Sequence, residues 1–189
     1  MKLIKIQAVV ATLMPAKRRA EFALGVLEML NLPDVPVGIG TTATTNYQEV
    51  KAYEFYHTEN LISINTDELK NGAELLKTVL KANAASKRKA KLLLLSSFTD
   101  IAYLSVEYPE LLTKNTIDCV IMQGKYRIDE YGERDPDLLQ TTNNAYDVQA
   151  TKLWHQYMVS LFRNPRVVVA SSLCLKFPPR GCFSDRVSR

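Results

Sequence analysis

Residues 3–40 read LIKIQAVVATLMPAKRRAEFALGVLEMLNLPDVPVGIG, and this stretch decides the fold class. Residues 3–12 form an apolar, β-branched run of strand length. Pro15 suits the first turn of a helix, and residues 16–30 then carry apolar side chains at helical spacing. Residues 35–40 have the length and composition of a second strand. A strand, a helix and a strand in this order form a βαβ unit. Such a unit predicts a parallel sheet covered by helices, because parallel strands need a long crossover.

The rest of the chain continues the alternation of helices and strands. We expect helices at 68–85, 101–106 and 143–162, a helical turn at 109–112, and strands at 91–95, 117–122 and 166–170. Two polar stretches without a clear period are expected to be long loops, 41–68 and 125–142, and 176–189 is expected to be a C-terminal tail. The sequence therefore predicts one domain over residues 1–189, with a three-layer α/β/α architecture around an open, mostly parallel sheet.

Composition excludes several classes of protein. The chain has 189 residues, of which 47% are hydrophobic, so it can bury a sizeable core and is not expected to be disordered. Its 24 Lys and Arg against 20 Asp and Glu give a net charge of only +4. The basic runs at 17–19 and 87–91 lack interleaved aromatic residues, so we expect no nucleic-acid partner. No apolar stretch approaches the ~18 residues of a membrane span. Three widely spaced cysteines fit a reducing compartment, and we expect a cytoplasmic protein.

The expected ligand site lies at the carboxyl ends of the strands, where open parallel sheets bind their ligands. These ends are rich in hydroxyl groups and poor in carboxylates; they are residues 11–13, 40–42, 96–100, 122–124 and 170–172. No P-loop, complete GxGxxG or GxSxG motif follows any of them. The two histidines, His57 and His155, are too far apart in sequence to suggest a metal cluster.

Residues 141–147, TTNNAYD, place short hydrogen-bonding side chains at the start of a predicted helix. Asn and Asp are common N-caps, which satisfy amides of a first helical turn, and composition alone favours this reading. The alternative is that the amide side chains grip the hydroxyl groups of a sugar.

Several segments, in order along the chain, resemble the inosine/uridine-preferring nucleoside hydrolase family. They are 8–12 (AVVAT), 19–28 (RAEFALGVLE), 35–40 (VPVGIG), 94–102 (LLSSFTDIA), 109–111 (PEL), 120–124 (VIMQG) and 143–147 (NNAYD). The resemblance covers about residues 5–180 and is poorest in the loops. It implies a nucleoside hydrolase-like fold, and an activity that cleaves the N-glycosidic bond of ribonucleosides to base and ribose in nucleoside salvage.

The resemblance also implies a calcium ion and a set of site residues. Asn143, with Asn144 as the alternative register, would bind the nucleoside or a ribose-like ligand. The main-chain carbonyl of Leu95 would be a calcium ligand. Asp147 aligns with a family aspartate, and we interpret it as a capping residue. A hard cation such as calcium takes oxygen ligands, and water bound to it loses its proton more easily.

This sequence departs from the family pattern where the chemistry resides. The chain begins at what would be the family's second strand, so the first strand with its Asp-x-Asp-x-x-x-Asp-Asp motif has no counterpart. The late aspartate of the metal shell, with its neighbouring histidine, has none either. A calcium site without these carboxylates would bind calcium very weakly. We therefore expect a truncated or degenerate member whose catalytic residues are unknown and which is inactive in this form.

Two alternatives stay open. The chain could be a non-catalytic pseudoenzyme that binds ribose or nucleosides, or that acts as a protein-interaction module. It could also be an active hydrolase with a rearranged site, in which other carboxylates replace the lost ones; the candidates are Asp100, Asp118, Asp129, Asp135 and Asp137. In either case a parallel sheet that lacks a central strand exposes apolar surface, which predicts association of copies of the chain.

Overall fold

The computed structural model of the protein describes residues 4–42, 58–113, 115–123, 125–128, 134–137, 141–161 and 167–170. The helices are α1 (Ala16–Met29), α2 (Gly72–Ala85), α3 (Thr99–Glu107), α4 (Thr142–Ala145) and α5 (Val148–Leu161), with single 3-10 turns η2 (Glu59–Leu61), η3 (Thr66–Glu68) and η4 (Pro109–Leu111). The strands are β1 (Val9–Ala11), β2 (Val37–Ile39), β3 (Lys70–Asn71), β4 (Ala90–Leu94), β5 (Ile117–Gln123), β6 (Lys125–Ile128), β7 (Arg134–Asp137) and β8 (Val167–Ala170). None of the helices in the described part of the chain is long and apolar enough to cross a membrane.

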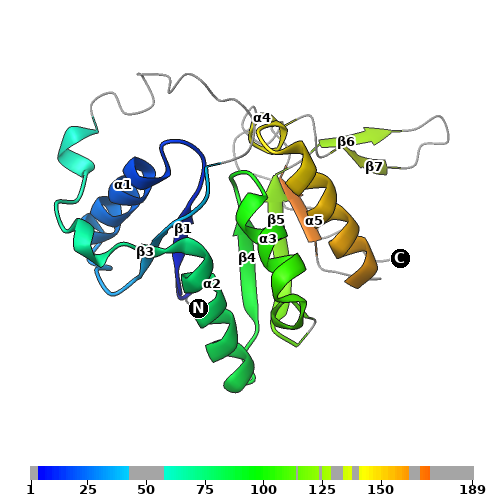
Figure 1. Cartoon of the computed structure of the whole chain (residues 1–189), viewed down its shortest axis with the longest axis horizontal. Helices are drawn as coiled ribbons and strands as arrows, with labels where there is room; N and C mark the ends of the chain where they lie inside the picture. Colours follow the sequence, from blue (N-terminus) through cyan, green and yellow to red (C-terminus); the bar gives the residue numbers. More distant parts are fainter. Residues whose placement is uncertain are drawn as a thin grey trace.

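Hydrogen bonding divides these strands among three sheets (Figure 1). One parallel sheet has the order β1-β2-β3, and a second has the order β4-β5-β8. The third is an antiparallel pair of β6 and β7. The βαβ unit predicted from residues 3–40 is present as β1, α1 and β2, with Val9 opposite Val37 in the register. The expectation of a mostly parallel α/β fold is confirmed.

Helices pack on both faces of the pair formed by β1 and β2. Side chains of β1 and β2 that point to one face join a core with α1; this core is Ala20, Leu24, Leu27, Val35 and Val37, with Val9, Ala11 and Ile39 packed against it. On the other face, Gly38 lies against the start of α2, where a Cβ on Gly38 would be 2.7 Å from the Cα of Gly72. Backbone therefore packs directly on backbone at this crossing, which only glycine permits.

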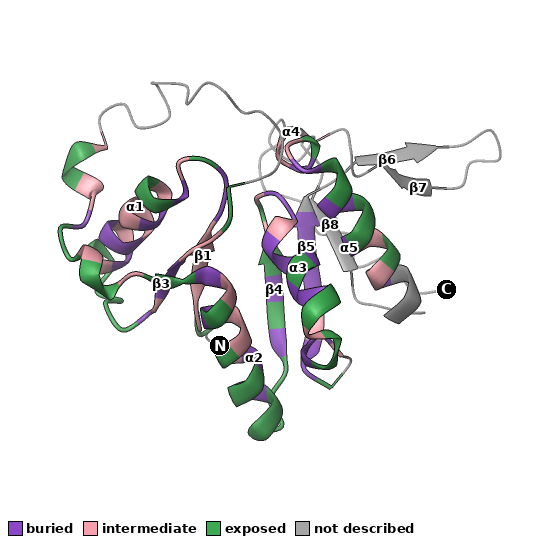
Figure 2. Ribbon diagram, viewed as in Figure 1, coloured by how far each residue is buried: buried purple, intermediate pink, exposed green. Residues whose placement is uncertain are grey.

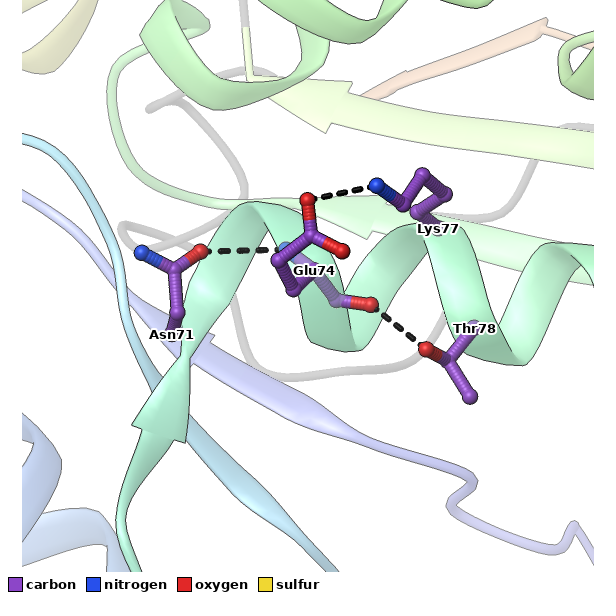
Figure 3. Close-up of polar contacts among 4 residues, drawn as sticks. All are labelled: Asn71, Glu74, Lys77 and Thr78. Atoms are coloured by element: carbon purple, nitrogen blue, oxygen red, sulfur yellow. Dashed lines mark hydrogen bonds and ion pairs between the residues drawn. The ribbon is translucent and has the colours of Figure 1, made fainter.

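Helix α2 begins at Gly72, directly after the capping residue Asn71. The spacing of the apolar residues predicted an earlier start, at Glu68. The side chain of Asn71 accepts a hydrogen bond from the Glu74 amide at 3.1 Å, and Lys77 pairs with the Glu74 carboxylate (Figure 3). Residues Lys70 and Asn71 pair with β2 before the helix starts. The apolar stripe of the helix extends back to Leu69, so periodicity misplaced the start, whereas the Asn71 cap defines it.

The larger core lies between the second parallel sheet and the helices α2, α3 and α5. Its members are Leu80, Ala90, Leu92, Phe98, Ile101, Ala102, Leu104, Leu111, Leu112, Ile117, Val120, Met122, Ala150, Trp154 and Met158. Trp154 is completely enclosed and stacks on Tyr157, with the ring centroids 5.9 Å apart. Figure 2 shows the buried residues along β5 and on the helices beside it.

The opposite face of β4 is open. Along this strand, residues alternate between the core and the surface, and Leu93 remains 60% exposed. Within the described residues, helices therefore cover one face of β4 and both faces of β1 and β2. Apolar side chains on a parallel strand are normally buried on both faces.

Four sequence expectations need correction. The range 125–142 is not simply a loop, because it contains the hairpin of β6 and β7. In β7, three charged residues and Pro136 give no strand signal, whereas in β6 the alternation of Tyr126 and Ile128 with basic residues is a short strand pattern that the prediction overlooked. Of the predicted strand 3–12, whose residues 4–12 are described, only Val9–Ala11 pair with a neighbouring strand in that described part. The range 41–68 includes the turns η2 and η3. The predicted helix 143–162 is interrupted between α4 and α5. The expected tail 176–189 and residues 43–57 lie outside the described residues.

Candidate functional site

The carboxyl ends of β1, β2 and β4 meet at one edge of the molecule, where ligands of parallel α/β proteins bind. Thr12, the residue after β1, donates its hydroxyl to that of Ser96, which follows β4. The main-chain amide of Thr41, two residues after β2, donates to Asp100 Oδ1 at 3.0 Å. These contacts bring three of the hydroxyl-rich strand ends predicted from sequence into one place.

Asp100 is the buried carboxylate of this edge. It lies in the first turn of α3 and is only 5% exposed. Burial raises the pKa of the Asp100 carboxyl, while hydrogen bonds from the Thr41 amide and hydroxyl oppose that rise. Gly40 makes room for the carboxylate, because a Cβ at Gly40 would be 2.6 Å from Asp100 Oδ2.

A second series of hydrogen bonds joins the start of α3 to the start of α5. The hydroxyls of Ser97 and Thr99 are 3.1 Å apart, and Thr99 donates to Asp147 Oδ2 at 2.8 Å. The other oxygen of Asp147 accepts the amide of Ala150 at 2.9 Å. This last contact is an N-cap of α5 and confirms the interpretation of Asp147 as a capping residue.

The predicted site residues Asn143 and Leu95 are in direct contact. The side-chain amide of Asn143 donates to the main-chain carbonyl of Leu95 at 2.9 Å. Asn143 is partly exposed, and Leu95 is exposed, at the end of β4. Asn144, the alternative register, is fully buried, and its carbonyl accepts the Thr151 hydroxyl at 3.0 Å. The structure thus places Asn143 on the strand-end edge and Asn144 inside the helical layer.

Of the other candidate carboxylates, Asp118 is the one whose side chain is described, and it does not join Asp100. Asp118 lies near the beginning of β5, where it pairs with Lys91 at 3.4 Å. Asp129 lies outside the described residues, and the side chains of Asp135 and Asp137 on β7 are not described. His57 is also outside, and His155 is a half-buried residue of α5.

The described residues of this edge do not fit the calcium ion that the resemblance implied. Within the described part of the chain, no three His, Cys, Asp or Glu side chains gather in a way that could hold a metal ion. Among the candidate carboxylates, the described contacts place Asp100 on this edge, through its hydrogen bond from the Thr41 amide. Calcium sites need several oxygen ligands, usually with more than one carboxylate. We therefore assign no chemical step to calcium here.

Two polar links of this edge were not predicted from sequence. These are the contact between Thr41 and Asp100 and the contact between Thr99 and Asp147, which join residues 59 and 48 positions apart. The signal that could have indicated them is the position of Asp100 in the first turn of α3 and of Asp147 directly before α5. That pattern indicates helix capping and carries no information on the distant partner.

Comparisons with known proteins show the fold. No family model matches the sequence, and no curated protein matches it significantly. Among solved structures, the chain is similar to the type III effector protein XopQ complexed with adenosine diphosphate ribose and to the effector protein XOO4466. The TM-score is 0.70 and the identity 22% in both cases. The match covers 89% of this chain, but 49% of XopQ and 47% of XOO4466. The chain thus spans about half the length of the solved structures whose α/β fold it shares.

Proposed function

We propose that this chain is a nucleoside hydrolase-like protein that binds a ribose-containing small molecule at the carboxyl ends of β1, β2 and β4 and does not hydrolyse it. The observation that carries the proposal is the hydrogen bond from Asn143 to the Leu95 carbonyl, at the edge that also holds Asp100. The family resemblance assigns Asn143 to the sugar and the Leu95 carbonyl to the metal, and these two residues are in contact.

The chemistry of this edge suits a sugar. A ribose hydroxyl both donates and accepts, so it is satisfied by a mixture of amide, carbonyl and hydroxyl groups. Asn143 supplies an amide, Leu95 a carbonyl, and Ser96 and Thr12 supply hydroxyls. Hydrolysis would further require an activated water, and the described residues provide no metal site to activate it.

The fold likeness suggests which ligand to test first. XopQ has been solved with adenosine diphosphate ribose, and its fold matches 89% of this chain. ADP-ribose contains two riboses, and a nucleoside contains one. We propose that both kinds of compound are candidates, with the ribose as the shared group that binds.

Calorimetric titration with ADP-ribose, inosine and uridine, each with calcium and with a chelator, tests the binding. We expect saturable heat from at least one of them without calcium. Asn143→Ala should weaken that affinity about tenfold, the scale of one well-placed hydrogen bond. Asn115→Ala, at an exposed asparagine in the turn before β5, is the matched control and should change nothing.

A ribose-release assay on the same samples tests the second half of the proposal. We expect no release of ribose from inosine or uridine. Turnover by the purified chain would contradict the non-catalytic assignment and favour the rearranged active site. Absence of heat with all three compounds at millimolar concentration would remove the binding proposal itself.

A further inference from the structure

The Asp100 carboxyl group has few hydrogen-bond donors around it among the described residues. Among the described residues, its hydrogen-bond donors are the amide and the hydroxyl of one residue, Thr41. An ionised carboxylate has two oxygens and about four acceptor positions. Some of that capacity is therefore unused by the described residues, although Asp100 is only 5% exposed.

The position of the carboxylate is built by three elements. Asp100 comes from the first turn of α3, Thr41 from the end of β2, and Thr12 from the end of β1. A Cβ on Gly40 would lie 2.6 Å from Asp100 Oδ2 and 2.8 Å from the Thr12 side chain. The absence of a side chain at Gly40 is what lets the carboxylate reach this point.

Holding Thr41 does not require a charge. A neutral asparagine at this position could accept the same amide and hydroxyl donors through its side-chain oxygen. Burial disfavours the ionised form, so the carboxylate costs folding free energy that a neutral amide would not cost. The start of α3 offsets part of this cost through its dipole, because carboxylates are favourable in a first helical turn.

We propose that Asp100 is a ligand-binding residue of the strand-end site, where its carboxylate accepts hydrogen bonds from the hydroxyl groups of a ribose. This inference rests on the proposed function and deepens it, because it names the residue that selects hydroxylated ligands. Thr41 is exposed and donates directly to Asp100, so the carboxylate is in contact with a surface residue of the site. A hydroxyl pair is the fitting partner, because its donors fill acceptor positions that Thr41 leaves open.

The test compares inosine with 2′-deoxyinosine and 3′-deoxyinosine by calorimetry, on the wild-type chain and on Asp100→Asn. The wild type should bind inosine about tenfold or more tightly than at least one deoxy compound, the scale of a hydrogen bond to a charged group. Asp100→Asn should bind the three compounds with nearly equal affinity. Asp118→Asn, which removes a carboxylate paired with Lys91 elsewhere in the structure, should keep the wild-type preference.

Each outcome decides the matter. If the wild type binds inosine and Asp100→Asn retains the same preference, the role of Asp100 is wrong and the proposed function stands. If the wild type binds inosine and both deoxy compounds equally, Asp100 is again excluded, and this comparison needs no variant. If binding of inosine strengthens more than about tenfold with calcium, the carboxylate serves a cation and the inference fails. If the wild type binds no ribose compound, both the proposed function and this inference are wrong.

Discussion

Thr99 in the first turn of α3 donates its hydroxyl to Asp147, the cap of α5, at 2.8 Å across 48 residues of sequence. The second oxygen of Asp147 caps α5 through the Ala150 amide. One side chain thus connects two helices of the larger core and fixes the place where α4, which carries Asn143, meets α5.

Replacement of Asp147 should therefore destabilise the fold. We expect Asp147→Ala to lower the free energy of unfolding by about 1–3 kcal/mol, since it removes a cap and leaves the half-buried Thr99 hydroxyl without its acceptor. Urea denaturation monitored by circular dichroism measures this. Thr99→Ser, which keeps a hydroxyl, should cost much less, and Asp34→Ala at an exposed turn should be neutral. Equal losses in Asp147→Ala and Asp34→Ala would contradict the link.

Asp100→Asn should change stability in a pH-dependent way. Burial raises the folded-state pKa of Asp100 above its unfolded value. A group of this kind contributes stability below the unfolded pKa, about 3.9, and loses it as the pH rises through the folded pKa. We therefore expect the variant to be at least as stable as the wild type at pH 7, and relatively less stable at pH 3.

Thermal melts of both proteins between pH 3 and pH 7 provide the measurement. The difference in melting temperature should move in favour of the wild type as the pH falls. A constant difference over this range would show that the carboxyl of Asp100 titrates alike in the folded and unfolded chain.

Gly38 should not tolerate even one added methyl group. A Cβ at this position would lie 2.7 Å from the Cα of Gly72 and 3.2 Å from a methyl group of Leu75. Because the closer neighbour is backbone, we expect Gly38→Ala to destabilise the protein by about 1–3 kcal/mol. Chemical denaturation of Gly38→Ala and of the double variant with Leu75→Ala separates the two contacts. Restored stability in the double variant would mean that side-chain crowding, and not the backbone approach, sets the limit.

Local sequence signals predicted most elements of the fold but neither β3, β6 and β7 nor all of the limits of the others. The βαβ unit at 3–40 follows from an apolar run, Pro15 and helical spacing, which are all local features. The hairpin of β6 and β7 is harder to predict, because β7 consists of charged residues and Pro136 and the alternating pattern of β6 is only four residues long. The division of the strands between two parallel sheets depends on which strands pair, and the sequence of each strand carries no such information.

The same distinction holds for the candidate site. The strand ends were expected to be hydroxyl-rich and to meet, because that follows from parallel topology. The burial of Asp100 and its bond to Thr41 depend on tertiary packing across 59 residues, which no local pattern specifies. Which of Asn143 and Asn144 is buried likewise depends on which face of α4 points inward, and Asn144 is the buried one.

The open face and edge of β4 predict association between copies of the chain. In the described residues β4 pairs only with β5 and β1 only with β2, so each has an edge without a hydrogen-bonded neighbour. Leu93 and Leu95 beside the β4 edge are 60% and 56% exposed, and an apolar strand with an open edge is a template for pairing.

We expect sedimentation velocity to show an average mass that increases with protein concentration. Leu93→Lys should reduce this increase, because a charge on an edge strand opposes pairing, whereas Lys91→Arg on the same face should not. A monomer at every concentration, in the wild type as in Leu93→Lys, would show that this face is not used for self-association.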